Sequence, residues 1–368
     1  MPLVPKAIKE LRPYSPGKPV EEVRRELGLE RIIKLASNEN PWGPSPRAIT
    51  AAAFALTDSN RYPDMLARDL REALAERFAV KVENVVVGSG SESIMANIMR
   101  TFLCDEDEIL TAENTFVGFM VLARGSGRKI TLVPRRDDYR YDLEAMAEQL
   151  SEYTKIIYLA NPDNPTGTIF TRPEFDAFME HVPSRTLVIY DEAYIEFAGD
   201  DPNFPDSMSY RYDNVITLRT FSKAYGLAGL RIGYGFAHED LIANLMKVKL
   251  PFEPSVPAQA AGRAALVDLD FLEKTLEGTK SGRVILEAGL AETGFEALPC
   301  STNFIAVKTP GVEACRGLCR ALLEQGVIVR PLEAFGFPEL FRVTVGTEEE
   351  NEFFLGALKK VTEGTGDE

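Results

Sequence analysis

Short apolar, β-prone runs alternate with helix-like stretches across residues 80–235 of this chain. The runs lie at residues 85–87, 108–111, 129–133, 155–159, 186–190 and 215–218. Strands that are apolar on both faces and separated by helices are typical of a mostly parallel α/β sheet covered by helices on each side. Ligands of such sheets bind beyond the carboxyl ends of the strands, so we expect the functional residues at that edge.

The pattern changes after a proline-rich stretch at residues 251–257. Long helical segments follow, with two further strand-like runs at residues 304–307 and 341–345. This order predicts a second, smaller α+β domain. A chain of 368 residues suits two such units, and we place a large domain over residues 41–255 and a small domain over residues 256–368.

Charge and composition exclude several kinds of partner. The formal net charge of −15 argues against nucleic acid or an anionic membrane, and any phosphate-bearing ligand must be held by local arginines and backbone amides. The four cysteines and two histidines show no metal-binding spacing, so we expect no metal. Since the first residues do not resemble a signal peptide and no run could span a bilayer, we expect a cytoplasmic protein.

The segment TFSKAYGLAGLR, residues 220–231, carries the most specific chemical signal. Its Lys223 follows a short apolar run and lies among small residues, where a lone lysine would ordinarily be a solvated surface group. Two upstream segments change this interpretation, NPDNPTG at residues 161–167 and YDEAY at residues 190–194. In the second segment Asp191 ends an apolar run, where a carboxylate has no packing role.

In this order the three segments resemble the cofactor site of the fold-type-I aminotransferases, which hold pyridoxal 5′-phosphate (PLP) on a lysine. The resemblance extends from about Tyr14 to Gly346 and is strongest to the histidinol-phosphate branch of that family. It implies the fold-type-I α/β architecture, a large PLP-binding domain with a smaller α+β domain. It also implies an N-terminal arm, residues 1–40, packed against the small domain, and a homodimer whose active sites are shared.

The resemblance gives the catalytic roles to Lys223 and Asp191. Lys223 would bind PLP covalently and then move protons, which requires its pKa to lie below the ordinary lysine value of about 10.4. Asp191 would keep the ring nitrogen of PLP protonated, so that the ring can accept electrons from the substrate. The resemblance places Ser91, Glu92, Ser222, Arg231 and, from the other subunit, Tyr62 on the cofactor phosphate, Phe116 on the ring face, and Asn164 and Tyr194 on the phenolate oxygen.

Some of these segments have other readings when taken alone. The glycine turn at residues 87–93 follows a strand and precedes a helix, which also suits a dinucleotide phosphate, although the third glycine of that fingerprint is missing. Residues 161–167 alone would be an ordinary turn. The joint occurrence of the three segments favours the PLP site.

Substrate recognition is assigned by resemblance to Tyr14, Asn38, Arg330 and Arg342. Both arginines accompany strand-like runs near the carboxyl end of the chain, and a guanidinium suits phosphate and carboxylate alike. Structural salt bridges are the alternative for this pair. One departure from the branch lies at residues 252–253, where this chain has Glu253 in place of the common Asn and Phe252 where some members have Tyr.

Together these features predict a PLP-dependent aminotransferase that exchanges an amino group between L-histidinol phosphate and 2-oxoglutarate in histidine biosynthesis. An aromatic amino-acid aminotransferase and a threonine-phosphate decarboxylase are alternatives on the same scaffold. An NAD-dependent oxidoreductase and a non-catalytic PLP-fold binding protein are alternatives from other classes. The oxidoreductase would leave Lys223 and Asp191 without a role, and the binding protein would show no amino exchange.

Overall fold

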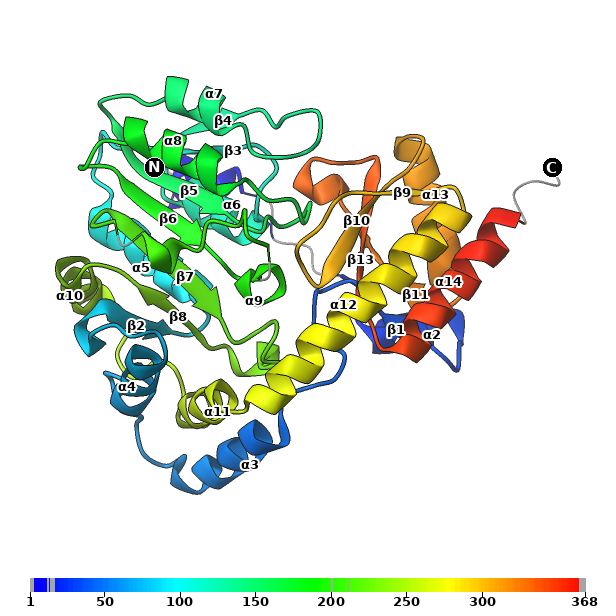
Figure 1. Ribbon diagram of the computed structural model, residues 1–368, viewed down its shortest axis with the longest axis horizontal. Coiled ribbons are helices and arrows are strands. Elements are labelled where there is room, and N and C mark those ends of the chain that lie inside the picture. Colours follow the sequence, from blue (N-terminus) through cyan, green and yellow to red (C-terminus); the bar gives the residue numbers. More distant parts are fainter. Residues whose placement is uncertain (1–2, 12, 14–16, 200, 211, 364–368) are drawn as a thin grey trace.

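The computed structural model describes residues 3–11, 13, 17–199, 201–210 and 212–363 (Figure 1). Its largest sheet has seven strands in the order β2-β8-β7-β6-β5-β3-β4. The strands are β2 (Val85–Gly88), β3 (Glu108–Ala112), β4 (Lys129–Val133), β5 (Thr154–Ala160), β6 (Leu187–Asp191), β7 (Val215–Thr220) and β8 (Gly233–Phe236). Every pairing is parallel except the two that β8 makes with β2 and β7, which confirms the predicted mostly parallel sheet.

Alternate residues of the central strands enter two separate hydrophobic cores. One face is covered by α5 (Ser91–Phe102), α6 (Val117–Gly125) and α10 (Glu239–Val248), and the other by α7 (Leu143–Glu148) and α8 (Arg172–His181). In β5, Ile156 and Tyr158 pack into the first core while Ile157 and Leu159 pack into the second. Burial on both faces explains why this run is apolar at nearly every position.

A third core covers the end of the sheet that contains β2 and β8. It is formed by α4 (Arg68–Arg77) and α11 (Val256–Leu266), with α3 (Pro46–Ala55) packed on α11. The sequence did not indicate β8, because GYGF is short and its glycines are typical of turns. Gly235 is required by the close approach of β8 to β7, since a Cβ at this position would lie 2.7 Å from the carbonyl oxygen of Thr217.

The smaller part of the molecule is an α+β unit, as predicted. Its antiparallel sheet has the order β12-β13-β10-β9, and three helices cover it (Figure 1). These elements are β9 (Glu296–Ala297), β10 (Phe304–Lys308), β12 (Arg330–Pro331), β13 (Leu340–Thr344), α12 (Leu269–Glu292), α13 (Val312–Glu324) and α14 (Glu348–Glu363). Short 3-10 helices lie at Leu56–Asp58, Val82–Asn84, Ser207–Ser209, Ala228–Leu230 and Glu333–Phe335.

The N-terminal segment contacts both parts of the molecule. The strand β1 (Ile33–Lys34) pairs with β11 (Val327–Ile328), and α2 (Val20–Leu27) packs beside that pair. The first helix, α1 (Lys6–Lys9), lies instead against α6 of the large part. The division of the chain at residues 40 and 255 stays a prediction. Within the described residues, no helix combines the length and apolar character needed to cross a membrane.

Some helices begin with a side-chain cap, whereas the helix at the site does not. At α8, Thr171 and Glu174 form a capping box, and at α3 the Ser45 hydroxyl accepts a hydrogen bond from the Ala48 amide. At α5 the first position outside the helix is Gly90, which supplies no side-chain acceptor. The first amides of α5 can therefore serve a ligand.

Candidate active site

Loops at the carboxyl ends of the parallel strands enclose a cavity of about 210 Å³. The predicted cofactor residues that line it are Ser91, Glu92, Phe116, Asn164, Asp191, Tyr194, Ser222, Lys223 and Arg231. Tyr158, Ala160, Pro162, Ala193, Thr220 and Ala228 complete the lining. The structure thus brings together segments that are far apart in the sequence, at the edge of the sheet where the strand pattern predicted a ligand site.

The amine of Lys223 lies in this cavity, just after β7. Its Nζ donates hydrogen bonds to the backbone oxygens of Ser37 (3.4 Å) and Asn38 (3.3 Å). Burial and the nearby guanidinium of Arg342 lower the pKa of Lys223 to about 8. A lysine with such a pKa is partly neutral near physiological pH, which is the state in which an amine acts as a nucleophile or a base.

The loop that follows Lys223 is held against residues 40–44. Asn40 donates from Nδ2 to the backbone oxygen of Ala224 at 3.0 Å. Gly226 has φ +69°, and a Cβ at this position would lie 2.2 Å from the carbonyl oxygen of Gly43. Only glycine permits this backbone conformation and this close approach together.

Asp191 ends β6 and is 5 % exposed. Its Oδ2 accepts a hydrogen bond from the Tyr158 hydroxyl at 2.7 Å, and its Oδ1 accepts one from the Ala193 amide at 3.2 Å. Burial raises the pKa of Asp191 to about 6, while these two bonds act in the opposite direction. The carboxylate is therefore mostly ionised at neutral pH.

The sequence did not indicate Tyr158 as a site residue, because it lies inside a run that reads simply as a buried strand. Its partner across the β5–β6 pairing is Ile189, two residues before Asp191, so both side chains lie on the same face of the sheet. The only available signal was a hydroxyl in an otherwise aliphatic stretch.

One end of the cavity is suited to an anion. A Cβ at Gly90 would lie 2.7 Å from Nη2 of Arg231, and a Cβ at Gly233 would lie 2.4 Å from the amide nitrogen of Ser91. The two glycines thus allow the guanidinium and the start of α5 to come close together. Arg231 also forms an ion pair with Glu92 at 3.4 Å. Backbone amides at a helix start, together with a guanidinium, are typical ligands of a phosphate.

Two amide side chains converge on the hydroxyl of Tyr194. Nδ2 of Asn38 donates to it at 2.9 Å and Nδ2 of Asn164 at 3.4 Å. The backbone amide of Asn38 is itself held by the Thr344 hydroxyl at 2.9 Å. Oδ1 of Asn164 accepts a hydrogen bond from Nη1 of Arg342 at 2.5 Å. Predicted substrate residues and predicted cofactor residues therefore belong to one hydrogen-bond network.

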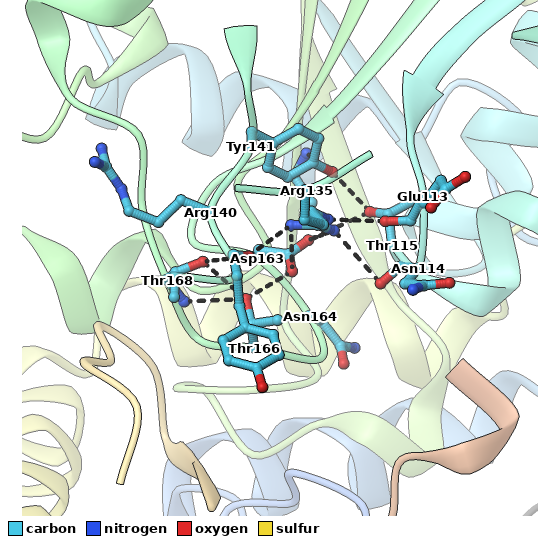
Figure 2. Close-up of polar contacts among 12 residues, drawn as sticks. Glu113, Asn114, Thr115, Arg135, Arg140, Tyr141, Asp163, Asn164, Thr166 and Thr168 are labelled. Atoms are coloured by element: carbon cyan, nitrogen blue, oxygen red, sulfur yellow. Dashed lines mark hydrogen bonds and ion pairs between the residues drawn. The ribbon is translucent and has the colours of Figure 1, made fainter. Parts of the chain in front are cut away.

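A buried ion pair holds two walls of the cavity in place (Figure 2). Arg135 and Asp163 approach to 3.1 Å, and their side chains are 5 % and 0 % exposed. Arg135 also donates to the backbone oxygens of the two residues before Thr115, and the Thr115 hydroxyl bonds Asp163 at 3.3 Å. Phe116 follows Thr115 and Asn164 follows Asp163. The ion pair therefore links the loop that carries Phe116 to the loop that carries Asn164.

Arg330 and Arg342 lie directly opposite each other in the β12–β13 pairing. Both are buried, and their guanidinium carbons lie 5.5 and 5.8 Å from the centre of the Phe335 ring. Like charges opposite each other repel, so this arrangement suits an anion between them. A Cβ at Gly17 would lie 3.8 Å from Nη1 of Arg330, which brings the N-terminal segment to this point. Tyr14 lies outside the described residues.

Tyr62 is the predicted cofactor residue that does not line the cavity of its own chain. Its side chain is 81 % exposed and stacks on Phe252, with ring centroids 4.4 Å apart and an interplanar angle of 23°. Its predicted contact with the cofactor of another subunit stays a prediction.

Comparisons with known proteins agree with this geometry. Residues 30–358 match the family model of aminotransferases of class I and II. The chain is 45 % identical over 363 residues to a histidinol-phosphate aminotransferase of Anaeromyxobacter sp. (strain Fw109-5), covering 98 % of this chain and 99 % of the relative. It is 42 % identical over 358 residues to the enzyme of the same name from Moorella thermoacetica, covering 96 % and 92 %.

Solved structures give the same result. Histidinol-phosphate aminotransferase from Sinorhizobium meliloti, in complex with PLP, superimposes with a TM-score of 0.89 at 29 % identity, covering 99 % of each chain. Aspartate aminotransferase from Thermus thermophilus with maleate, at 23 % identity, has a TM-score of 0.83 over 99 % of this chain and 100 % of that one. The second comparison bears on the fold alone.

The lowered pKa of Lys223 predicts its reactivity. In cofactor-free protein, the rate of modification by an amine-reactive reagent should rise with a midpoint near pH 8, because the neutral amine is the reactive form. Peptide mapping by mass spectrometry at a series of pH values measures this rate for each lysine. Exposed lysines in the same sample serve as controls, and Lys223 should become reactive at a lower pH than they do. A midpoint for Lys223 equal to theirs would contradict the prediction.

Proposed function

The chain belongs to the class I and II aminotransferase family, and we propose that it is a PLP-dependent enzyme exchanging an amino group between L-histidinol phosphate and 2-oxoglutarate. The observation that carries this proposal is that one cavity contains both the Lys223 amine and the Asp191 carboxylate. The choice of substrates rests on the histidinol-phosphate aminotransferases that share 40–45 % of their residues with this chain over nearly its whole length.

The residues of the cavity fit PLP at each of its functional groups. The Lys223 amine can bind its aldehyde, the Asp191 carboxylate its ring nitrogen, and Arg231 with the start of α5 its phosphate. The hydroxyl of Tyr194 and the amide of Asn164 are donors for its phenolate oxygen. When bound, PLP supplies an electron sink for the carbon that loses its proton.

The protein residues then provide binding and proton transfer. Once the substrate amine had taken its place, the free Lys223 amine would move a proton to or from the carbon that bears the nitrogen. Asp191 stays ionised and holds the proton on the ring nitrogen. Phe116 lines the cavity and is proposed to stack on one face of the ring. The network of Asn38, Asn164 and Tyr194 fixes the polar groups that face the ring oxygen.

One site must bind, one after the other, two substrates that carry different anionic groups. Histidinol phosphate carries a phosphate but no α-carboxylate, whereas glutamate carries two carboxylates. Arg330 and Arg342 are proposed to bind these anions, because guanidinium groups from two adjacent strands can hold either one. Asn38, and Tyr14 from outside the described residues, are proposed to complete the substrate site.

A second candidate on the same scaffold is an aromatic amino-acid aminotransferase. The observation that favours it is the exposed, stacked pair of Tyr62 and Phe252, which would suit an aromatic side chain as well as an imidazole. This surface is also proposed to contact a second subunit. Activity toward the two classes of amino donor separates the candidates.

We further propose a homodimer with shared sites. Exposed apolar side chains form a patch at residues 62–65 and 250–252, where Tyr62, 81 % exposed, stacks on Phe252, and Phe54 on α3 is also 76 % exposed. Such a patch on a folded chain is typical of a protein–protein interface. The proposed reaction belongs to amino-acid biosynthesis, and on that ground we propose that the enzyme acts in the cytoplasm.

A panel of amino donors with 2-oxoglutarate as acceptor tests the function. Glutamate should form fastest with histidinol phosphate and more slowly with phenylalanine, and no carbon dioxide should be released. Lys223→Ala and Asp191→Ala should remain folded and lose most of this activity, because the covalent anchor or the ring-nitrogen partner is absent. Near-wild-type turnover in either variant would contradict the assigned role, and a preference for phenylalanine would favour the second candidate.

Replacement of Arg330 and of Arg342 should affect the activity toward the two amino donors differently. Arg330→Ala should lose far more kcat/KM toward histidinol phosphate than toward phenylalanine, which has no phosphate. Removing one charge-assisted partner costs about 1.5–3 kcal/mol, or roughly 10- to 150-fold. Arg342→Ala should impair both half-reactions. Arg330→Lys is the matched control that keeps the charge without the planar fork, and equal losses toward both donors in Arg330→Ala would remove its phosphate-reading role.

Subunit complementation tests the shared site. Neither Lys223→Ala nor a severely impaired variant of Tyr62 should be active alone, but a mixture should recover activity, because one site of the heterodimer then has both residues intact. Amino exchange is measured after subunit mixing, with exchange verified by native mass spectrometry. Full exchange without recovery would show that Tyr62 acts within its own subunit or not at all.

A further inference from the structure

We propose that Tyr158 is a positioning residue for Asp191, whose carboxylate it holds ionised and oriented toward the cavity, so that the proton shared with the ring nitrogen of PLP stays on the nitrogen. The inference rests on the proposed function and adds a residue to it. It starts from one buried hydrogen bond, between the Tyr158 hydroxyl and Oδ2 of Asp191 at 2.7 Å.

The carboxylate of Asp191 is held at both oxygens. Tyr158 donates to Oδ2, and the amide of Ala193 donates to Oδ1 at 3.2 Å. Two donors at two oxygens fix the plane of the carboxylate, and the remaining lone pairs stay available to the cavity. The tyrosine is itself immobile, because its side chain is fully buried and its ring stacks on Phe119 with centroids 3.8 Å apart and planes 8° apart.

The hydroxyl of Tyr158 can act only as a donor here. Burial, followed by the negative charge of Asp191, raises the pKa of Tyr158 well above the ordinary tyrosine value. The phenol therefore keeps its proton throughout the working pH range. A hydrogen bond that is donated to a carboxylate stabilises the ionised form over the protonated one.

The other groups around Asp191 mostly oppose its ionisation. Burial acts most strongly in that direction, and the carboxylates of Glu92 on α5 and Glu192, the residue after β6, add to it. The Tyr194 phenol lies nearby and is neutral, since burial raises its pKa to about 12. Tyr158 is thus the side-chain donor that offsets these effects on Asp191. The resulting pKa of about 6 lies only slightly below neutral pH, so a small further rise would leave much of the carboxylate protonated.

The pKa of Asp191 affects the cofactor because one proton is shared between its carboxylate and the ring nitrogen of PLP. When the carboxylate is the weaker base of the pair, the proton lies on the ring nitrogen and the ring is a good electron sink. Removing the phenol makes the carboxylate a stronger base, so the proton moves toward Asp191. The ring then withdraws electrons less well, and the proton-transfer step slows while substrate binding is unchanged.

A neighbouring tyrosine provides a matched control. Tyr190 directly precedes Asp191 and is equally buried, but its hydroxyl donates to the backbone oxygen of Pro205 at 3.0 Å and its ring lies in the core on the opposite face. Tyr158→Phe and Tyr190→Phe therefore each remove one buried hydroxyl and keep the ring. Only the first removes a donor from the carboxylate.

The first experiment measures the titration of Asp191 in cofactor-free protein. The carboxyl ¹³C resonance, assigned by its loss in Asp191→Asn, is followed by NMR as a function of pH. In Tyr158→Phe the midpoint should rise by about one to two pH units, the size expected for one hydrogen bond to a charged group. In Tyr190→Phe it should stay at the wild-type value. An unchanged midpoint in Tyr158→Phe, or equal shifts in both variants, overturns the proposal.

The second experiment uses the holoenzyme and a variant that preserves the buried hydroxyl. With ¹⁵N-labelled PLP, the ring-nitrogen resonance should move toward the unprotonated position in Tyr158→Phe and not in Tyr190→Phe, and kcat should fall with little change in KM. Replacing Tyr158 by 3-fluorotyrosine, a stronger donor, should lower the Asp191 midpoint, which keeps the test decisive if Tyr158→Phe does not fold. A midpoint that fails to fall in the fluorinated protein contradicts the inference. If the wild type exchanged no amino group, the proposed function would fail, while the cofactor-free titration would still decide on Tyr158.

Discussion

Burial of an amine and a carboxylate in one cavity is the constraint on which the rest of this structure depends. Removal from water disfavours both charged forms, so it lowers the pKa of Lys223 to about 8 and raises the pKa of Asp191 to about 6. The pKa values of the two groups thereby approach neutral pH, that of Lys223 from above and that of Asp191 from below. A neutral amine beside an ionised carboxylate is the combination that proton transfer at a bound cofactor requires, and the lowered pKa of Lys223 brings this combination closer to neutral pH.

The surrounding contacts hold the walls of this cavity in place. Residues 37–43 close one side through hydrogen bonds to Lys223 and Ala224 and a close approach at Gly226. The buried pair of Arg135 and Asp163 links two other walls (Figure 2). Because desolvation offsets most of the attraction in a buried ion pair, such a pair contributes little net stability. Its contribution here lies in the fixed positions of the loops that carry Phe116 and Asn164.

The sequence predicted those parts of the molecule that follow a local pattern. Apolar runs indicated the parallel strands, and three motifs indicated most of the cavity lining. The strand β8 was missed because two of its four residues are glycines, whereas the strand-like run that accompanies Arg330 forms the short strands β11 and β12. Tyr158 was missed because the pattern of a buried strand does not reveal which residue lies next to a carboxylate on the neighbouring strand. Contacts between subunits, such as that proposed for Tyr62, need a second chain.

The arginines of the small sheet connect the proposed substrate site to the proposed cofactor site. Arg342 faces Arg330 across β12 and β13, and the same guanidinium donates to Oδ1 of Asn164 and to the backbone oxygen of Ala36. It therefore connects the small sheet, the N-terminal segment and the cavity of the large part. An anion between the two arginines reduces their repulsion and supplies the attraction that a chain of net charge −15 does not provide over long range. Because Asn164 also donates to Tyr194, an adjustment of Arg342 on binding the proposed substrate anion would be transmitted to the polar groups proposed to contact the cofactor ring.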